Sequence, residues 1–303
     1  MRSRCGPTPV TPGPAGETLD VIAGFLGPHD WIASYIRLPN PEGPAQPFLT
    51  AMQFQLGRLP TRAVLVAAAQ GVYQGWVNGV EVDDSVLKPG WTAYSERIVH
   101  EWTDVIALLT LGDNVLAFEV AGGWFTERYG FSIHGRRFYG EQPSVAGQII
   151  MDFEDGSRRI VATDHTWRAT GGGVTRSSGI YQGEEGDGRR AVLGWARVPL
   201  ASAQWGSAEL TPGPTPQVAI AEPVRRMTEL PVREVTRTKS GHLLIDFGQN
   251  LVGRLRITVE GPAGTVITLR HAEVLENGEL GTRPLREAWA KDTYTLSGDG
   301  REV

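Results

Sequence analysis

Two tryptophans of this sequence stand directly after glycines in segments that read as loops. They lie in Pro89-Gly90-Trp91 and in Gly122-Gly123-Trp124. A loop tryptophan can present its ring to solvent, whereas a strand tryptophan such as Trp76 is more often part of the core. An exposed flat ring packs well on the apolar face of a sugar ring. We therefore predict that Trp91 and Trp124 contact a carbohydrate, with burial in the core as the competing interpretation.

The acidic residues form no recognisable catalytic arrangement. Hydrolysis of a glycosidic bond with inversion needs two carboxylates about 6.5–9.5 Å apart. Asp83-Asp84 and Glu184-Glu185 are adjacent pairs, and neighbours on a strand point to opposite faces. The histidines show no zinc spacing, and Cys5 is the single cysteine. The sequence predicts no catalytic residue in this chain.

Composition and charge exclude several classes of protein. The formal net charge of −5 gives no electrostatic footprint for nucleic acid or an anionic membrane. One cysteine allows no disulfide within the chain, so the fold depends on its hydrophobic core. The first residues contain no apolar stretch of the kind found in secretory signals. We therefore expect a cytoplasmic protein.

Strand patterns and turn signals alternate along the sequence, which contains 38 Gly and 20 Pro. The apolar segment 63–69 lies between Pro60 and Gly71, too short a space for a helix, and predicts a buried strand. Asn78-Gly79 between residues 72–77 and 80–82 is the strongest hairpin signal. This rhythm predicts an all-β sandwich.

Changes in composition divide the chain into four parts. We predict a disordered leader over 1–28, a first β-sandwich domain over 29–205, a linker with a lead-in strand over 206–231, and a second β domain over 232–303. In the second domain, residues 260–264 are expected to join two strands as a hairpin. Residues 301–303 are expected to begin a strand that returns beside 293–296. An unfinished hairpin would leave an open sheet edge, so we expect a longer polypeptide.

Several segments resemble, in order, the N-terminal region of bacterial α-L-rhamnosidases, which are inverting glycoside hydrolases. The matching segments are G-V-Y-Q-G-W-V-N-G-V-E-V (71–82), L-K-P-G-W-T-A-Y (87–94), L-G-D-N-V-L-A-F-E-V-A-G-G-W-F (111–125), S-G-I-Y-Q-G-E (178–184), residues 243–275 with D-F-G-Q-N and R-H-A-E, and A-K-D-T-Y-T-L-S-G (290–298). The D-F-G-Q-N and R-H-A-E pieces are the most specific. The family's acidic catalytic motif is not found in the sequence.

The resemblance implies a fold and a partner. It implies an N-terminal jelly-roll (galactose-binding-like) β-sandwich followed by a second, incomplete β-sandwich, ahead of a missing (α/α)6 catalytic domain of the same polypeptide. It also implies that rhamnose-containing glycosides are the ligands. Related modules hold calcium between protein oxygens and rhamnose hydroxyls, which makes Asp113 and Asn114 candidates for substrate binding. A Gly-Asp-Asn turn also forms without a metal, so calcium is left undecided.

Five polar residues in the most specific segments are predicted to face another domain. They are Asp246, Gln249, Asn250, His271 and Glu273. The competing interpretation of the first three is a turn whose side chains bond to the local backbone. His271 and Glu273 alternate with Ala272 and would share one face of a strand.

Three hypotheses of function follow. The first is the non-catalytic β-domains of an α-L-rhamnosidase that hydrolyses terminal α-L-rhamnosyl residues. The second is a carbohydrate-binding module that works alone. The third is a structural or interaction fragment without a ligand.

Overall fold

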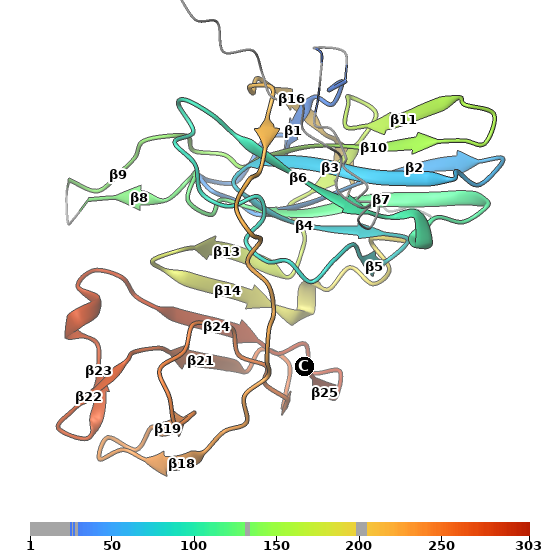
Figure 1. The fold of residues 1–303 in the computed structure, drawn as a ribbon. Coiled ribbons are helices and arrows are strands. Elements are labelled where there is room, and N and C mark those ends of the chain that lie inside the picture. Colours follow the sequence, from blue (N-terminus) through green and yellow to red (C-terminus); the bar gives the residue numbers. More distant parts are fainter. Residues whose placement is uncertain (1–24, 26, 28–29, 131–133, 198–204) are drawn as a thin grey trace, which may run out of the picture.

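Two stacked β-sheets form the larger, upper part of the molecule (Figure 1). The computed structural model describes residues 25, 27, 30–130, 134–197 and 205–303, so the predicted leader and Cys5 lie almost wholly outside it. Within these residues, one sheet has seven strands, with β16-β1-β10-β3-β6-β17 in order and β11 beside β10, and the other has six in the order β15-β12-β2-β7-β4-β5. The first sheet contains β1 (Tyr35–Arg37), β3 (Arg62–Gln70), β6 (Val99–Asp104), β10 (Ser144–Asp152), β11 (Arg158–Ala162), β16 (Glu209–Thr211) and β17 (Gln217–Val218). The second contains β2 (Phe48–Leu56), β4 (Val72–Val77), β5 (Val80–Glu81), β7 (Gly112–Ala121), β12 (Arg168–Thr170) and β15 (Gly206–Ser207).

Strand β3 is buried on both faces, which explains its continuous apolar sequence. Leu65 and Ala67 belong to the main core between the two sheets. Val64 and Val66 point the other way, into a second cluster under loops that cross the outer face of the sheet. The predicted strand over 63–69 is therefore confirmed. The second cluster is the support on which the candidate site rests.

The turn between β4 and β5 is the hairpin that the sequence predicts. Asn78 and Gly79 have φ angles of 53° and 77°, so both central residues are left-handed, as a two-residue hairpin of type I′ requires. The pairing of Val77 with Val80 closes it.

A four-stranded sheet connects the sandwich to the lower part of the molecule (Figure 1). The hairpin of β13 (Thr175–Gly179) and β14 (Gly183–Asp187) follows the sandwich strands in sequence. Strand β14 then pairs in parallel with β24 (Lys291–Thr295), which pairs antiparallel with β21 (Val266–Arg270). We call this sheet the connecting sheet.

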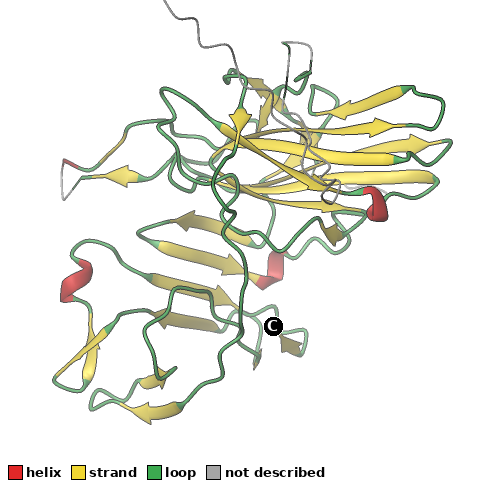
Figure 2. Cartoon of the chain, viewed as in Figure 1, coloured by secondary structure: helices red, strands yellow, loops and turns green. Residues whose placement is uncertain are grey.

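Strands and loops account for almost all of the described chain (Figure 2). The helical segments described are short 3₁₀ turns: η1 (Ile106–Leu108), η3 (Gly188–Arg190) and η4 (Arg283–Leu285). Two-stranded ribbons complete the lower part, with β18 (Glu234–Arg237) beside β19 (Leu243–Asp246), β20 (Val259–Glu260) beside β25 (Arg301–Glu302), and β22 (Val274–Glu276) beside β23 (Glu279–Gly281). The all-β prediction is confirmed.

Two details of the expected organisation are corrected. The segment expected as a linker from residue 206 supplies β15, β16 and β17, which pair with β12, β1 and β6 of the sandwich. Residues 260–264 do not join a hairpin, because β20 pairs with β25 while β21 pairs with β24. The final residues therefore return beside β20 and not beside 293–296. Both differences are pairings between distant segments, which a local pattern does not specify.

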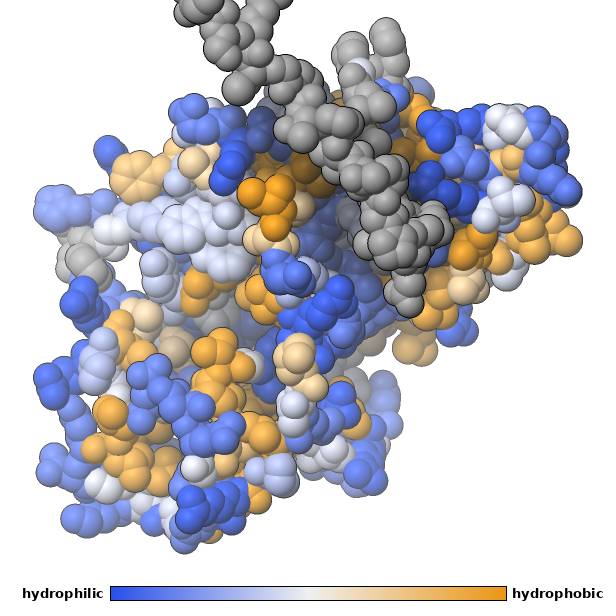
Figure 3. Space-filling view, viewed as in Figure 1, coloured by the Kyte–Doolittle hydropathy of each residue, from blue (hydrophilic) through white to orange (hydrophobic). Residues whose placement is uncertain are grey.

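Many apolar side chains of the lower part are exposed. Val235, Leu243, Val266 and Leu275 are all more than half exposed. Apolar groups are correspondingly visible across this region in Figure 3. Exposed apolar patches of this kind commonly mark interaction surfaces.

Candidate functional site

The loop that carries Trp91 is anchored by a buried lysine. Lys88 is 1% exposed, and its Nζ lies 2.9 Å from Asp83 Oδ1. Asp83 also accepts hydrogen bonds from the Thr103 hydroxyl at 2.7 Å and the Ser85 amide at 2.9 Å. Burial acts to raise the pKa of Asp83, but these bonds and the Lys88 charge outweigh it and hold the pKa below its usual value. The loop therefore leaves the sheet from a fixed point.

The turn that carries Trp124 depends on two glycines at the end of β7. Gly123 has a φ of 48°, and a Cβ there would lie 2.6 Å from a methyl carbon of Val72. A Cβ on Gly122 would lie 1.7 Å from the Thr126 hydroxyl oxygen. The chain can therefore turn sharply out of the sheet only with glycine at these positions. This turn fixes the direction in which Trp124 leaves the strand.

Trp91, Trp124 and Tyr129 have nearly parallel rings, and we call these three residues the aromatic platform. The ring centroids of Trp91 and Trp124 are 6.4 Å apart with 4° between the ring planes. Those of Trp91 and Tyr129 are 6.0 Å apart with 15° between the planes. Trp91 is 57% exposed, and ring-shaped side chains gather on this face of the sandwich (Figure 3). The predicted pair of loop tryptophans thus comes together, with Trp91 exposed and Trp124 partly buried against the cluster that covers β3.

A second layer of aromatic side chains supports the platform. Tyr94 packs edge-on against Phe125 and Tyr139, with centroids 5.2 and 5.1 Å away. Tyr139 in turn meets Tyr129 at 6.0 Å. Tyr94 and Phe125 belong to the cluster that covers β3. The platform therefore rests on packed side chains, which hold its rings in place.

Tyr129 lies on β8 (Arg128–Tyr129), which pairs with β9 (Arg136–Arg137). Its hydroxyl donates a hydrogen bond of 2.9 Å to the Trp124 carbonyl oxygen. Burial, with smaller contributions from Tyr139, Tyr181 and Glu127, raises the pKa of Tyr129 to about 12. The hydroxyl therefore stays protonated near neutral pH, and its hydrogen bond holds Tyr129 beside the turn that carries Trp124.

Glu127 ties the platform to the turn between β13 and β14. Its side chain is buried, and its Oε2 accepts a hydrogen bond of 3.2 Å from the Tyr181 amide. The Gln182 amide, in the orientation that satisfies both groups, donates to Glu127 at 2.9 Å. The Tyr181 ring consequently meets Tyr129 edge-on at 6.4 Å. Glu127 thereby positions a further exposed aromatic residue beside the platform.

Asp113 and Asn114 lie at the opposite end of β7 from Trp124. A strand rises about 3.3 Å per residue, so the ends of β7 lie roughly 30 Å apart. Asn114 is fully buried and donates hydrogen bonds to the carbonyl oxygens of Thr110 at 2.7 Å and Gly112 at 3.0 Å. This burial corrects the expectation of a substrate contact at Asn114. Asp113 is exposed and accepts a 3.0 Å hydrogen bond from Gln55.

The three predicted interface residues at the end of β19 lie on the surface. Asp246 Oδ1 accepts a 2.6 Å hydrogen bond from the Gly248 amide, which is the local turn that the sequence left as the alternative. Gln249 and Asn250 follow it and are exposed. Contact between these residues and another domain stays a prediction.

His271 and Glu273 follow β21, and their surroundings differ. His271 Nε2 lies 2.8 Å from Asp292 Oδ2, while Asp292 Oδ1 accepts a 2.8 Å hydrogen bond from the Glu184 amide of β14. His271 thus lies beside the contact between β24 and β14, just after the edge strand β21 of the connecting sheet. Glu273 is exposed.

The adjacent carboxylates named in the sequence are used in ion pairs or lie on strands. Asp84 pairs with Arg225, as Asp83 does with Lys88. Glu184 and Glu185 are neighbours on β14 and so point to opposite faces. No group of three or more His, Cys, Asp or Glu side chains gathers to hold a metal ion in the part of the chain that the structure describes. No helix within that part is long and apolar enough to span a membrane.

Tyr129, Tyr181 and Glu127 are site residues that the sequence interpretation missed. Tyr181 lies in the S-G-I-Y-Q-G-E segment, which carries the resemblance without predicting a role for the tyrosine. The dense run W-F-T-E-R-Y after Gly123 holds the other two. A charged residue inside such an aromatic run is the signal that marks them, since a buried carboxylate needs partners nearby.

Two family models match successive parts of the chain. The α-L-rhamnosidase N-terminal domain matches residues 58–229, and the bacterial α-L-rhamnosidase concanavalin-like domain matches residues 236–303. The chain belongs to the α-L-rhamnosidase family. This confirms the resemblance found in the sequence. The aromatic platform lies within the first match, and all five predicted interface residues lie within the second.

Individual α-L-rhamnosidases are similar over most of the chain. The enzyme from Streptomyces avermitilis is 38% identical over 254 residues, which are 81% of this chain and 24% of that protein. The structure of native α-L-rhamnosidase from Aspergillus terreus aligns with a TM-score of 0.87 at 36% identity, covering 92% of this chain and 33% of that one. The structure of the Streptomyces avermitilis enzyme complexed with L-rhamnose aligns with a TM-score of 0.80 at 37% identity, covering 86% and 25%. The chain thus spans about a quarter to a third of the length of these rhamnosidases.

Proposed function

We propose that this chain forms the N-terminal, non-catalytic β-domains of an α-L-rhamnosidase that hydrolyses terminal α-L-rhamnosyl residues of glycosides, and that its aromatic platform binds the glycoside. The observation that carries the binding role is the parallel arrangement of Trp91 and Trp124, with Trp91 57% exposed. Large aromatic rings are costly to leave in water, so an exposed Trp91 ring that stacks on the partly buried Trp124 favours a ligand role.

The chemistry of the platform suits a neutral sugar. Its rings offer apolar faces to the C–H groups of a pyranose, and the Tyr129 hydroxyl stays neutral because its pKa is raised to about 12. The platform carries no charge of its own near neutral pH. Binding there should therefore change little between about pH 6 and pH 9, since no group of the platform titrates in that range.

Catalysis is assigned to a separate (α/α)6 domain of the full-length enzyme. Inverting hydrolysis needs one carboxyl group to protonate the glycosidic oxygen and a second to activate water across a gap of about 6.5–9.5 Å. Asp83 and Asp84 face Lys88 and Arg225 in ion pairs, which suits a structural role. The exposed apolar side chains of the lower part, such as Leu243 and Leu275, give a surface on which that domain would pack.

Calorimetric titration of the 303-residue chain with L-rhamnose, with and without calcium, tests the proposal together with an assay of p-nitrophenyl α-L-rhamnoside hydrolysis. We expect binding without turnover, and loss of binding in Trp91→Ala by about tenfold or more because a buried aromatic contact is worth 1.4 kcal/mol or more. Trp102→Ala is the matched control, because Trp102 is similarly exposed (52%) but lies outside the platform.

The outcomes separate the hypotheses. Turnover by the isolated chain would contradict the non-catalytic assignment. Absence of L-rhamnose binding, or equal losses of affinity in Trp91→Ala and Trp102→Ala, would show that the platform is not the site of L-rhamnose binding. Tight binding that is unchanged when the rest of an enzyme is fused to the chain would favour a carbohydrate-binding module that works alone.

A further inference from the structure

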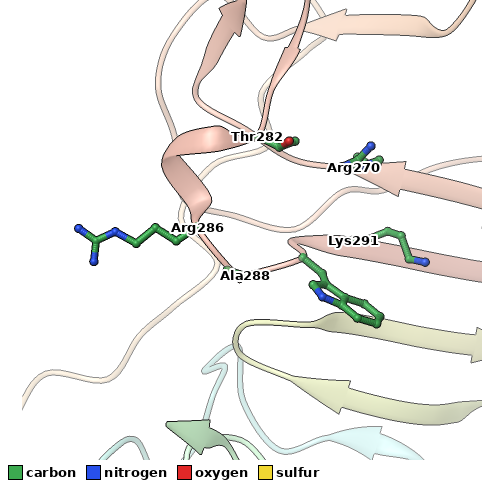
Figure 4. Close-up of a pocket in the computed structure, with 6 residues that line it drawn as sticks. Arg270, Thr282, Arg286, Ala288 and Lys291 are labelled. Carbon is green, nitrogen blue, oxygen red and sulfur yellow. The ribbon is translucent and has the colours of Figure 1, made fainter. Parts of the chain in front are cut away.

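A concave site lies in the lower part of the molecule, beside strands β21 and β24 of the connecting sheet. It has a volume of about 450 Å³ and is lined by Arg270, Thr282, Arg286, Ala288, Trp289 and Lys291. This volume falls within the roughly 300–1,000 Å³ typical of sites for small molecules. Arg270 and Lys291 extend from neighbouring strands on one side of the site, whereas Arg286 extends away from them (Figure 4).

Arg270 and Lys291 form an unfavourable pair within the protein itself. They are directly opposite each other in the antiparallel pairing of β21 with β24. Like charges at such positions destabilise a sheet. Among the described residues, no ion pair involves either side chain, and the carboxylate of Asp292, the residue after Lys291, is engaged by His271. Two cations placed directly opposite each other on one sheet favour an anionic ligand.

Trp289 adds an apolar surface to these charges. Its side chain is 63% exposed, and Lys291 Nζ lies 5.7 Å from the centre of its ring. An exposed ring beside two cations matches a ligand that has both an apolar face and a negative charge. A pyranose that carries a carboxylate, which is a uronic acid, has both.

The backbone joins this site to the aromatic platform. The amides of Trp289 and Ala290 both donate to the Tyr181 carbonyl oxygen, at 2.8 and 3.1 Å. The Tyr181 ring meets Tyr129 of the platform at 6.4 Å. Aromatic residues therefore continue from the platform to Trp289 across the connecting sheet.

We propose that Arg270, Lys291 and Trp289 bind the carboxylate-bearing sugar of an acidic glycan whose neutral sugars lie on the aromatic platform. The binding of neutral sugars on the platform rests on the proposed function. The binding of the carboxylate-bearing sugar rests on the geometry of the Arg270, Lys291 and Trp289 site alone. The chain has a net charge of −5, so attraction of a polyanion to the whole molecule is not expected. Local charge must supply any binding.

Native-gel electrophoresis of the 303-residue chain in gels that contain polygalacturonate tests the proposal. We expect the chain to be retarded by this polymer and much less by its fully methyl-esterified form, which has lost the charge. Arg270→Gln combined with Lys291→Gln should weaken binding by about tenfold or more, because charge-assisted hydrogen bonds are lost. Trp289→Ala should also weaken it. Lys239→Gln is the control, since it removes an exposed lysine from the turn between β18 and β19.

Three results would overturn the proposal. They are equal retardation by the charged and esterified polymers, equal effects of the double variant and Lys239→Gln, and retardation by a sulfated galactan but not by polygalacturonate. Thermal unfolding of each variant checks the fold, and the double variant should melt no lower than the parent because a repulsion has been removed. Titration with neutral L-rhamnose reports on the platform separately, so failure of one site is distinguishable from failure of the other.

Discussion

At the scale of single residues, Lys88 is the side chain whose burial most constrains the candidate site. It is 1% exposed, and its ammonium group faces Asp83 and lies 5.2 Å from the centre of the Tyr73 ring. A buried charge is tolerated only when it is paired, because transfer from water into the protein is costly. The backbone reinforces the anchor, since the Tyr73 amide donates a 2.9 Å hydrogen bond to the Lys88 carbonyl oxygen. The position of Trp91 therefore depends on an ion pair beneath it.

Lys88→Met should lower the free energy of unfolding at pH 7 by about 3 kcal/mol, because it leaves the partly buried Asp83 carboxylate without its charged partner. Since the folded protein holds the pKa of Asp83 below its unfolded value, this stabilisation is present above the unfolded pKa and is lost as pH falls through the folded one. The difference between variant and parent, measured by urea unfolding, should therefore be smaller at pH 3 than at pH 7.

Arg58→Met provides the matched control for this experiment. Arg58 also forms an ion pair, 2.7 Å from Asp155, but both side chains are more than half exposed. Exposed pairs contribute at most about 1 kcal/mol. A loss at Lys88 no larger than the loss at Arg58 would contradict the role given to the buried pair.

At the scale of elements, strand β7 and the turn after it decide where Trp124 lies. Strand β7 pairs with β4, which places residue 121 beside Val72. The chain must then turn within Gly122 and Gly123, and Val72 leaves no space for a side chain at Gly123. The parallel contact of Trp124 with Trp91 follows from this tight turn.

Gly123→Ala should lower the free energy of unfolding by more than about 1 kcal/mol, because alanine disfavours a positive φ and its Cβ would meet Val72. It should also weaken L-rhamnose binding by displacing Trp124. Gly57→Ala is the control, since a Cβ at Gly57 meets nothing within 4 Å. Urea unfolding and calorimetry measure the two effects. A variant that keeps full affinity would show that Trp124 tolerates movement, which contradicts the platform.

The features of these elements that the sequence predicts correctly are those that short, local residue patterns specify. Asn78-Gly79 specifies its hairpin because both residues accept positive φ, and the apolar run from Ala63 specifies a strand buried on both faces. The loop positions of Trp91 and Trp124 follow from their glycines. The parallel contact of the two rings does not follow from these glycines, because it arises from the pairing of β4 with β7.

Other features depend on contacts between segments far apart in the sequence. Asn114 is buried beside Asn78, which precedes it by 36 positions and donates a hydrogen bond to its side-chain oxygen, although its Gly-Asp-Asn turn reads as a surface turn. The parallel pairing of β14 with β24 joins residues more than 100 positions apart, and no local pattern encodes it. The charged site at Arg270 and Lys291 was missed for the same reason, since their register is set by that sheet.

At the scale of the whole molecule, the connecting sheet joins the two regions that the two family models match, residues 58–229 and 236–303. The parallel pairing of β14 with β24 is short, spanning Glu185 with Thr293 to Asp187 with Thr295. Asp292 extends it by accepting hydrogen bonds from the Glu184 amide and from His271. Because a short parallel pair is weak by itself, this carboxylate should contribute strongly to the joint.

Asp292→Ala should therefore increase hydrogen exchange of the β14 amides by about fivefold or more, since a charge-assisted hydrogen bond worth 1 kcal/mol or more is lost there. Exchange in β3 and β7 should stay unchanged, because the sandwich core does not contact Asp292 through any of these bonds. Hydrogen exchange followed by mass spectrometry resolves the two regions.

Asp299→Ala is the control for this measurement, because it removes the same type of side chain from the exposed turn before β25. If the β14 amides exchange at the same rate in both variants, Asp292 does not stabilise the contact between β14 and β24. The backbone pairing of the two strands is then enough to hold them together. If Asp292→Ala loosens β14 and also abolishes retardation by polygalacturonate while L-rhamnose binding persists, the connecting sheet transmits the defect to the cationic site. The joint would then serve to align the two binding surfaces along one glycan.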